Sequence, residues 1–511
     1  MENLNPKPLR GDEYFQSGNF GSNLKKHAAM GAGATVLTSF SVFFIQLFGV
    51  IILARLLKPS DFGLVAMVTS IYGFFQRLRN FGLTEATIQE KEINHNIISS
   101  LFWVNVAFSI LITSIFMALG PIISWFYNEP RISLIAIVIS LDLFFGGLAT
   151  QHQALLIRNF KFYKNAAIEI PSAVIGYGSA IILAWCGWGY WAIVSRWVIT
   201  ALAQAIGSWT FCKWRPSLPS YEPRIRPMIK FGVNMLGNFF ISYFSKSIDK
   251  ILIGRRYGSI SLGFYDRAYY LFNTPTATFS TPLVKVAVVT LSKLREDPEK
   301  YRRYYLNAIS NLSFIGFPLS AMLTVMSSDL VLLILGPQWG NTAEILFILG
   351  FATGIQIIYG SYAWLHISIG RSDRLFRWNI IGSAVIIVSC LVGLKFGVKG
   401  VAIAYTIAMY ILLGPCLSYA GKIMDIKLRS IIEVMWKYYL SSIFTGLILW
   451  FILNKSNMFV QLNVFSRLTI SSLIFALTYI FIVIIIYKSF QPVTQFISFL
   501  REMAPNIFKN K

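Results

Sequence analysis

Long apolar runs recur along almost the whole chain, and short polar stretches separate them. Each run is about 20 residues long, which is the length that an α-helix needs to cross the hydrocarbon core of a bilayer. The pattern therefore predicts an all-α polytopic membrane protein with about fourteen transmembrane helices. The predicted helices cover residues 30–53, 62–81, 97–119, 131–150, 167–186, 189–211, 231–253, 262–286, 307–326, 342–366, 377–395, 400–421, 434–453 and 466–487.

Two stretches of the chain resemble each other when the sequence is shifted by 200 positions. Residues 40–85 and 240–285 share six identities, one of which pairs Gly63 with Gly263. Each stretch is an apolar run, a short turn that carries Arg and then Gly, and a second apolar run. A repeat of six helices is parallel, so the pattern predicts two six-helix lobes related by an axis along the membrane normal.

The repeat divides the chain into predicted parts. A linker rich in Pro, Lys and Arg separates the lobes, because Pro at that density forbids a continuous helix. Two helices stand outside the repeat, and the C-terminal tail is either an interfacial helix or a frayed end. The parts are a tail (1–29), an N-lobe (30–211), the linker (212–230), a C-lobe (231–421), two further helices (434–487) and a second tail (488–511).

The loops between the predicted helices differ strongly in charge. An even number of crossings places both termini on one side, and the loops and tails of that side hold 31 of the 45 Lys and Arg residues, against 8 in the opposite loops. Cytoplasmic loops of membrane proteins collect Lys and Arg. The asymmetry therefore predicts cytoplasmic termini in the cell inner membrane. It also explains the net charge of +23, so no nucleic-acid partner is expected.

The composition agrees with a membrane protein and offers no catalytic signature. Hydrophobic residues make up 55% of the chain, charged residues 13%, and the mean hydropathy is +0.60. Residues 1–29 lack the apolar core of a cleavable signal peptide. The four cysteines form no CxxC motif, the four histidines are scattered, and no P-loop, HExxH motif or nucleophile elbow occurs. We therefore expect no metal, no cofactor and no enzymatic activity.

Charged residues inside the apolar runs carry the clearest functional signal. A charge exposed to lipid is costly, so such residues usually face a cavity or a partner. Asp142 is the deepest, near the middle of the fourth predicted helix. Residues near helix ends, such as Lys250, could instead extend to the lipid headgroups, and Lys246 and Asp249 could neutralise each other. Apart from Asp142, the set is Arg196, Lys246, Asp249, Lys250, Asp266, Arg267 and Lys285.

Several short phrases along the chain resemble one family in order and spacing. The family is the oligosaccharide-lipid flippase branch of the multidrug/oligosaccharidyl-lipid/polysaccharide exporter superfamily, especially the colanic acid exporter type. The resemblance implies two lobes that face each other across a central cavity, alternating access, and a substrate of sugars joined through pyrophosphate to a polyprenyl carrier. The phrases are residues 53–57, 61–67, 81–83, 101–105, 249–254, 262–269 and 297–302.

For such a substrate, the cations in the apolar runs become candidate ligands. A diphosphate that crosses a membrane leaves its water shell, and Lys and Arg replace that hydration with charge-assisted hydrogen bonds. The predicted substrate-binding residues are Arg196, Lys246, Lys250, Arg267 and Lys285, with Tyr265 and Tyr269 as sugar contacts. The acids predicted to tune the charge, or to carry a coupled ion, are Asp142, Asp249, Asp266 and Glu85.

The leading hypothesis is a flippase for lipid-linked oligosaccharide repeat units in O-antigen, capsule or exopolysaccharide assembly. Its expected partners are that substrate, the bilayer, a coupling H⁺ or Na⁺, and a polysaccharide polymerase with its co-polymerase. Two alternatives remain open at this point: a flippase for a peptidoglycan precursor, and a cation-coupled multidrug exporter of the same superfamily. A non-transporting scaffold is a further alternative. Intramembrane cations slightly outnumber acids, which disfavours the multidrug exporter.

Overall fold

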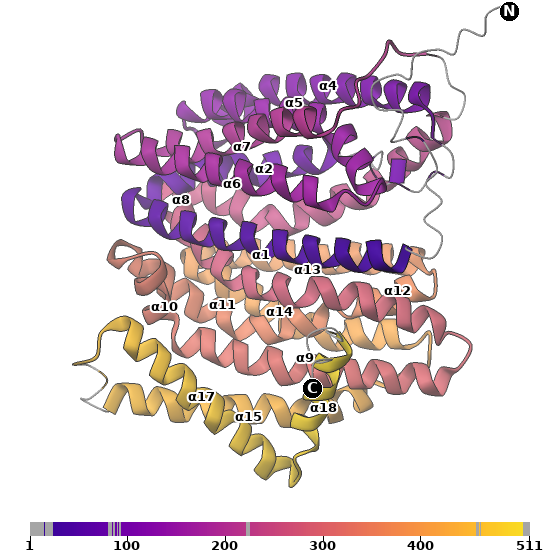
Figure 1. The fold of residues 1–511 in the computed structure, drawn as a ribbon. Helices are drawn as coiled ribbons and strands as arrows, with labels where there is room; N and C mark the ends of the chain where they lie inside the picture. The colour runs from indigo at the N-terminus through magenta and orange to yellow at the C-terminus, as the bar shows by residue number, and fades with distance from the viewer. Residues whose placement is uncertain are drawn as a thin grey trace, which may run out of the picture. The chain divides into compact units, whose positions relative to one another are not determined.

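The computed structural model describes residues 15, 24–79, 84, 87–88, 90, 93–220, 225–455, 459 and 461–503. Within these ranges all regular secondary structure is helical (Figure 1). The all-α prediction is therefore confirmed. The predicted transmembrane ranges lie on helix where they are described, with ends that differ by a few residues, except that a turn at residues 360–361 interrupts the range 342–366. By length and hydropathy, nine segments of the described chain could each cross a membrane. The number of crossings stays a prediction.

The chain divides into two compact units, residues 1–263 and 264–511. The division falls inside the long helix α8 (Ile225–Lys293) and not in the linker. The predicted lobe boundaries therefore stay a prediction. Besides the first part of α8, the first unit contains α1 (Leu24–Leu56), α2 (Pro59–Arg79), α4 (His95–Tyr127), α5 (Arg131–Arg158), α6 (Phe162–Trp185) and α7 (Tyr190–Phe211).

The second unit contains the rest of α8 and a longer series of helices. Its membrane-length helices are α9 (Pro298–Val325), α11 (Gly340–Tyr359), α13 (Ser372–Gly393), α14 (Gly397–Gly421), α15 (Leu428–Lys455) and α17 (Val464–Tyr487). Short elements connect or follow them: α10 (Ser327–Ile334), η3 (Pro337–Trp339), α12 (Tyr362–Ser368), η4 (Leu394–Phe396) and α18 (Gln491–Met503).

Helices in each unit pack closely where small residues meet. A Cβ on Gly147 of α5 would lie 2.0 Å from the Oγ of Ser109 on α4, and one on Gly350 of α11 would lie 2.5 Å from the Oγ1 of Thr324 on α9. Small residues are common at such contacts in membranes, where backbone approach and van der Waals packing replace the hydrophobic effect. Each unit therefore contains a pair of helices that pack closely through a glycine and a small hydroxyl residue.

Helix α8 bends at Gly258, and the bend supports the repeat in the sequence. The φ angle of Gly258 is 77°, a left-handed conformation that glycine adopts without steric cost. The helix after this bend begins at Ser259. That position is 200 residues after Pro59, where α2 begins.

Gly63 of α2 and Gly263 of α8 mark a close crossing inside the first unit. A Cβ on Gly63 would lie 1.7 Å from the carbonyl oxygen of Ser259, and one on Gly263 would lie 2.0 Å from that of Pro59. Gly63 and Gly263 are 200 positions apart, and so are the helix starts Pro59 and Ser259. Each glycine therefore contacts the start of the helix in the other copy. A contact that maps onto itself in this way is typical of a two-fold axis. The crossing agrees with the predicted repeat, and its axis stays a prediction.

Residues 212–220 of the linker pack against the start of α4. The side chain of Trp214 is fully buried, and its indole Nε1 donates to Nδ1 of His95 at 3.3 Å. Nε1 of Trp103 donates to the carbonyl oxygen of Ser217 at 2.8 Å. This half of the linker is therefore part of the first unit.

Ion pairing, hydrogen bonds and aromatic packing join the helices outside the repeat to the rest of the second unit. Arg467 of α17 forms a bidentate ion pair with Asp329 of α10, and both side chains are mostly buried. On α18, the ring of Phe496 packs on Phe314 of α9, with ring centroids 4.9 Å apart. Phe490 before α18 is 67% exposed. An exposed aromatic beside this helix suits the predicted interfacial position, which stays a prediction.

We expect Arg467→Ala to destabilise the second unit by about 1–3 kcal/mol, because it leaves the Asp329 carboxylate largely buried without its counter-charge. The measurement is the thermal unfolding midpoint of the purified protein in detergent. The matched control is Arg429→Ala, which removes an ion pair with Glu433. The side chains of Arg429 and Glu433 are 89% and 58% exposed. An Arg467→Ala midpoint no lower than that of the control would contradict the anchoring role.

Candidate functional site

The buried acid Asp142 of α5 is held by two residues of α2. Asp142 is 6% exposed, and the hydroxyl of Tyr72 donates to its Oδ2. Arg79 Nη1 lies 3.4 Å from the same oxygen and donates to the Asp142 backbone oxygen at 3.1 Å. The guanidinium fits because Gly146 has no side chain: a Cβ there would lie 1.9 Å from Nη1. Asp142 thus pairs inside its own unit and links α5 to α2.

Arg196 of α7 lies among aromatic rings of the first unit. Its Nη1 donates to the hydroxyl of Tyr177 at 3.0 Å. Its guanidinium carbon lies 5.0 Å from the ring centroid of Tyr177 and 4.5 Å from that of Trp197. Trp197 also packs edge-on against Tyr72, the residue that binds Asp142, at 5.8 Å. Arg196 is therefore held beside the Asp142 group by cation–π contacts.

The first part of α8 brings a second group of cations to α2. Lys246 is exposed, and Arg77 of α2 is near enough for the two positive charges to repel each other. Arg77 also lies over the ring of Tyr243, 6.0 Å from its centroid, and Tyr243 donates to the carbonyl oxygen of Ser70 at 3.1 Å. Two cations on neighbouring membrane helices form a site whose electrostatic repulsion an anion would relieve.

The other two predicted residues of this part of α8 lie one turn further along. Asp249 is 3% exposed, and its Oδ1 accepts the backbone N–H of Lys250 at 2.8 Å. The Lys250 side chain is half-buried. Lys250 and Arg77 both act electrostatically on the hydroxyl of Tyr243. Arg77 and Lys250 therefore both lie near Tyr243, and Lys246 follows this tyrosine by one turn of α8.

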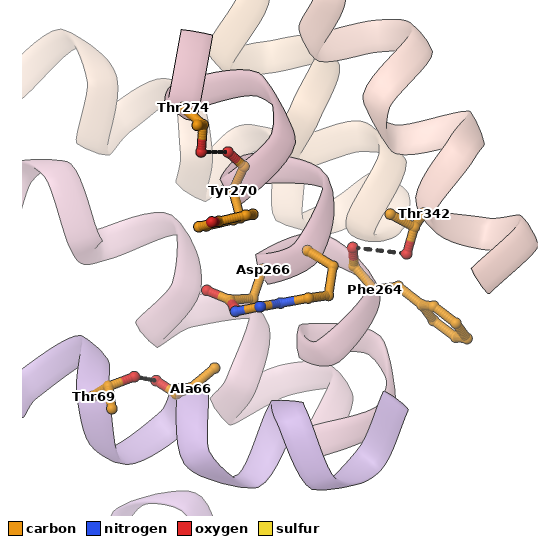
Figure 2. A network of polar contacts seen from close by, with 8 residues as sticks. Ala66, Thr69, Phe264, Asp266, Tyr270, Thr274 and Thr342 are labelled. Atoms are coloured by element: carbon orange, nitrogen blue, oxygen red, sulfur yellow. Dashed lines mark hydrogen bonds and ion pairs between the residues drawn. The ribbon is translucent and has the colours of Figure 1, made fainter. Parts of the chain in front are cut away.

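In the second unit, Asp266 and Arg267 pair with each other on α8. Nη2 and Nε of Arg267 lie 2.5 and 3.2 Å from Oδ2 of Asp266. The Arg267 guanidinium lies 5.2 Å from the ring centroid of Tyr270. Figure 2 shows Asp266 and Tyr270 on the same side of this helix. On the same helix, the carbonyl oxygen of Phe264 accepts a hydrogen bond from the hydroxyl of Thr342 at 3.1 Å. This hydrogen bond anchors the helix that carries the pair to α11.

The two tyrosines predicted to contact sugars lie in different surroundings. Tyr265 is fully buried and stacks on Tyr269, with ring centroids 6.3 Å apart. Tyr269 is half-buried and meets Tyr405 of α14 edge-on at 6.4 Å. The accessible ring of the two is therefore Tyr269. Two further predicted residues, Glu85 and the side chain of Lys285, lie outside the described residues.

Several residues that the structure brings into these groups were not expected from the sequence, and three of them lie on α2. Two of them, Arg77 and Arg79, lie in the last turn of α2, where the charge pattern assigns them to a cytoplasmic loop. The third, Tyr72, stands seven residues before Arg79, so the two share a helix face. That spacing is the one signal in the sequence that could have linked them to a partner.

An apolar cavity of about 460 Å³ lies within the second unit, among α9, α11, α14 and α15. Phe317, Phe351 and Trp450 line it together with the hydroxyl-bearing residues Tyr410 and Tyr439. Such a lining suits a hydrocarbon chain better than a polar group. In the described part of the chain, no cluster of three His, Cys, Asp or Glu side chains could hold a metal ion.

Comparison with known proteins decides the family. The model of a family described as "Polysaccharide biosynthesis protein" matches residues 52–344, which is more than half of the chain. The chain belongs to this polysaccharide biosynthesis family. The predicted resemblance to a polysaccharide exporter is therefore confirmed.

Two curated relatives illustrate the family. The lipopolysaccharide biosynthesis protein WzxC of Escherichia coli K12 is 24% identical over 430 residues, which are 82% of this chain and 86% of WzxC. The succinoglycan biosynthesis transport protein ExoT of Rhizobium meliloti is 22% identical over 358 residues, which are 70% of this chain and 72% of ExoT.

A solved structure shows the same fold. The lipid II flippase MurJ, in an inward closed conformation, superposes with a TM-score of 0.71 at 17% identity. The match covers 89% of this chain and 99% of MurJ. At this level of identity the likeness concerns the fold alone. It confirms the predicted all-α fold class.

Proposed function

We propose that the protein is an alternating-access flippase. It moves polyprenyl-pyrophosphate-linked oligosaccharide repeat units across the cytoplasmic membrane for polysaccharide biosynthesis. The family, the transport role printed in the name of ExoT and the fold shared with MurJ support this function. The proposed movement requires no catalysis, because the substrate crosses the membrane without changing a covalent bond.

The observation that carries the proposal is the place of two cations beside one tyrosine: Arg77 of α2 lies over the ring of Tyr243, and Lys246 follows Tyr243 by one turn of α8. Cations inside membrane segments are costly and usually face a cavity, a partner or a ligand. A pyrophosphate between them would offset their repulsion and accept charge-assisted hydrogen bonds from both. Lys250 offers a further cation in the first unit, and the Arg267–Asp266 pair offers charged groups in the second.

The other parts of the substrate match other features of the chain. Tyr269 offers a half-buried aromatic face to a sugar ring, and the apolar cavity lined by Phe317 and Trp450 offers space to the polyprenyl tail. In this proposal both termini lie in the cytoplasm. Ion coupling through Asp142, Asp249 or Asp266, and contact with a polysaccharide polymerase, complete the proposed cycle.

Charge removal tests the proposed diphosphate site. We expect Arg77→Ala with Lys246→Ala, and Lys246→Ala with Arg267→Ala, to lower glycan export by about tenfold or more, because each lost charge-assisted bond is worth about 1.5–3 kcal/mol. Export is measured as surface polysaccharide in cells that lack their own exporter, at matched membrane levels of each variant. Arg429→Ala, an 89% exposed cation of α15, is the control. Undiminished export in both double variants would refute the site.

A further inference from the structure

A cation lies beside aromatic rings where α15 meets the end of α17 in the second unit. The ammonium nitrogen of Lys437 on α15 lies 4.6 Å from the ring centroid of Tyr487 on α17 and 6.0 Å from that of Trp436. The faces of aromatic rings attract a cation at such distances. Trp436 is 43% exposed, so this cation is held near the surface of the unit.

A second cation follows directly at the end of α17. Lys488 adopts a left-handed conformation with a φ of 51°, and its backbone N–H donates to the carbonyl oxygen of Ile485 at 3.3 Å. The chain turns here, and the side chains of Lys488 and Phe490 are exposed. Since Lys488 is the next residue after Tyr487, both cations belong to the same end of α17.

The acids of this region do not offset the two lysines. Helix α17 contains no Asp or Glu, and the one acid of α15, Glu433, pairs with Arg429 at 2.9 Å. In α18 an arginine and a glutamate stand side by side in the sequence. The ion pairs within the described part of the second unit involve neither Lys437 nor Lys488. The two positive charges therefore suit an anion from outside the chain.

Exposed apolar side chains flank the lysines and indicate the kind of anion. On α15, Ile432 is 50% exposed and stands one turn before Trp436. Beyond α17, Phe490 is 67% exposed. A soluble anion would leave these side chains in water, whereas a phospholipid covers them with its acyl chains. Lysine and aromatic residues beside apolar ones are typical of the level in a bilayer where headgroups meet acyl chains.

We propose that Lys437 and Lys488 bind the headgroup of an anionic phospholipid, phosphatidylglycerol being the simplest example. The phosphodiester accepts charge-assisted hydrogen bonds from the two ammonium groups, and the acyl chains lie against Ile432 and Trp436. In the predicted topology this lipid belongs to the cytoplasmic leaflet, whose anionic lipids attract cations close to the membrane surface. The site is separate from the proposed site for the transported lipid-linked glycan.

The lipid site adjoins the contact that joins α15 and α17 to α9. The ring of Tyr487 packs on that of Tyr438, with centroids 5.0 Å apart, and the hydroxyl of Tyr438 lies 3.0 Å from that of Ser310 on α9. The next residue of α15, Tyr439, lines the apolar cavity. A lipid bound at Lys437 therefore stabilises this contact beside the cavity. Because it binds the folded protein, it should raise the thermal unfolding midpoint.

The test measures lipid binding to the purified full chain by native mass spectrometry. The two probes are phosphatidylglycerol and phosphatidylcholine with identical acyl chains, so they differ in the net charge of the headgroup. We expect the wild type to bind phosphatidylglycerol more tightly. Lys437→Gln combined with Lys488→Gln should weaken phosphatidylglycerol binding about tenfold, because two cations near the headgroup are lost. Binding of phosphatidylcholine should not change in this variant.

Lys395→Gln combined with Lys455→Gln is the matched control, because it removes the same charge elsewhere. Lys455 stands at the opposite end of α15, with its ammonium nitrogen 5.1 Å from the ring centroid of Phe451, and Lys395 is exposed in η4. This control should bind phosphatidylglycerol as the wild type does. Lys437→Arg combined with Lys488→Arg keeps both charges and should also match the wild type. Phosphatidylglycerol should raise the thermal midpoint of these proteins more than that of the Gln variant at 437 and 488.

Three results would overturn the inference: equal affinity of the wild type for the two lipids, unchanged phosphatidylglycerol affinity in the Gln variant at 437 and 488, or an equal loss in the control at 395 and 455. The last result would show a response to net charge alone. If the double Gln variant does not accumulate, Lys488→Gln makes the same comparison, with binding about threefold weaker, because this side chain is exposed. Lipid binding is measured without transport, so failure of the proposed function does not change these outcomes.

Discussion

Replacing Gly63 by alanine should reduce glycan export to about a tenth or less of the wild-type level, because overpacking of this kind costs about 1–3 kcal/mol and each 1.4 kcal/mol is a factor of ten. The new Cβ would lie 1.7 Å from the carbonyl oxygen of Ser259. A backbone oxygen inside a helix cannot rotate away as a side chain does, so α2 and α8 must separate. Gly263→Ala should have a similar effect, since its Cβ would meet the oxygen of Pro59.

Export is measured at matched membrane levels, determined by immunoblot, and the thermal midpoint of each purified variant separates a folding defect from a transport defect. Gly178→Ala in α6 and Gly33→Ala in α1 are matched controls, because a Cβ at either position has no atom within 4 Å. In a helix, alanine is more stable than glycine by about 0.5–1 kcal/mol, so the controls should be neutral or slightly stabilised. Full export by Gly63→Ala would contradict the prediction, because it would show that transport tolerates the wider separation of α2 and α8.

Breaking the buried pair of Arg79 and Asp142 should destabilise the protein by about 3–5 kcal/mol, because either single change leaves a charge without its partner in a low-dielectric interior. Arg79→Met and Asp142→Leu should therefore each lower the thermal midpoint strongly. The double variant should recover most of the loss, since two apolar side chains replace the pair and leave no charge behind. The measurement is a double-mutant cycle of unfolding midpoints in detergent.

The control cycle uses Glu129 and Arg131, an ion pair 2.8 Å long whose arginine side chain is 51% exposed. The hydrogen bond from Arg131 lowers the pKa of Glu129 from its ordinary value. Solvent-exposed pairs contribute about 0–1 kcal/mol, so these single variants should stay near the wild type. If the drop in unfolding midpoint of the double variant equals the sum of the drops in Arg79→Met and Asp142→Leu, the two side chains do not act as a pair.

Most of the helical fold could be predicted because each helix buries an apolar run of membrane length. The helix limits were less predictable, since helices continue into polar sequence beyond the bilayer core until a cap ends them. At the start of α4, for example, the side chain of Asn94 accepts the backbone N–H of Ile97. Likewise, α9 starts after Asp297, which accepts from Lys300. Both caps lie before the predicted helix starts.

The candidate site was less predictable, because its contacts join residues far apart in the chain. The sequence identified Asp142 as an acid within a membrane helix, but its partner Arg79 lies 63 residues earlier. Arg79 stands at a helix end, where arginine is expected in a cytoplasmic loop. Its guanidinium reaches Asp142, and the absence of a side chain at Gly146 makes room for it. No local pattern encodes that combination.

The contact between Gly63 and Gly263, by contrast, has a signal in the sequence. A shift of 200 residues along the sequence matches these two glycines, and in the fold they meet at one helix crossing. A symmetry axis between the two predicted copies would need residues that can contact their own counterparts. Glycine allows that contact by exposing its backbone.

Reconstitution tests the central claim most directly. Purified protein is placed in proteoliposomes that carry a fluorescent polyprenyl-pyrophosphate oligosaccharide in the inner leaflet, and an external glycosidase reports each glycan that reaches the outer leaflet. The account predicts cleavage of the inner-leaflet pool with the wild type, and cleavage near that of protein-free liposomes with Arg77→Ala and Lys246→Ala combined. Equal cleavage in wild-type and protein-free liposomes would contradict it, as would movement of a peptidoglycan precursor in place of the polysaccharide unit.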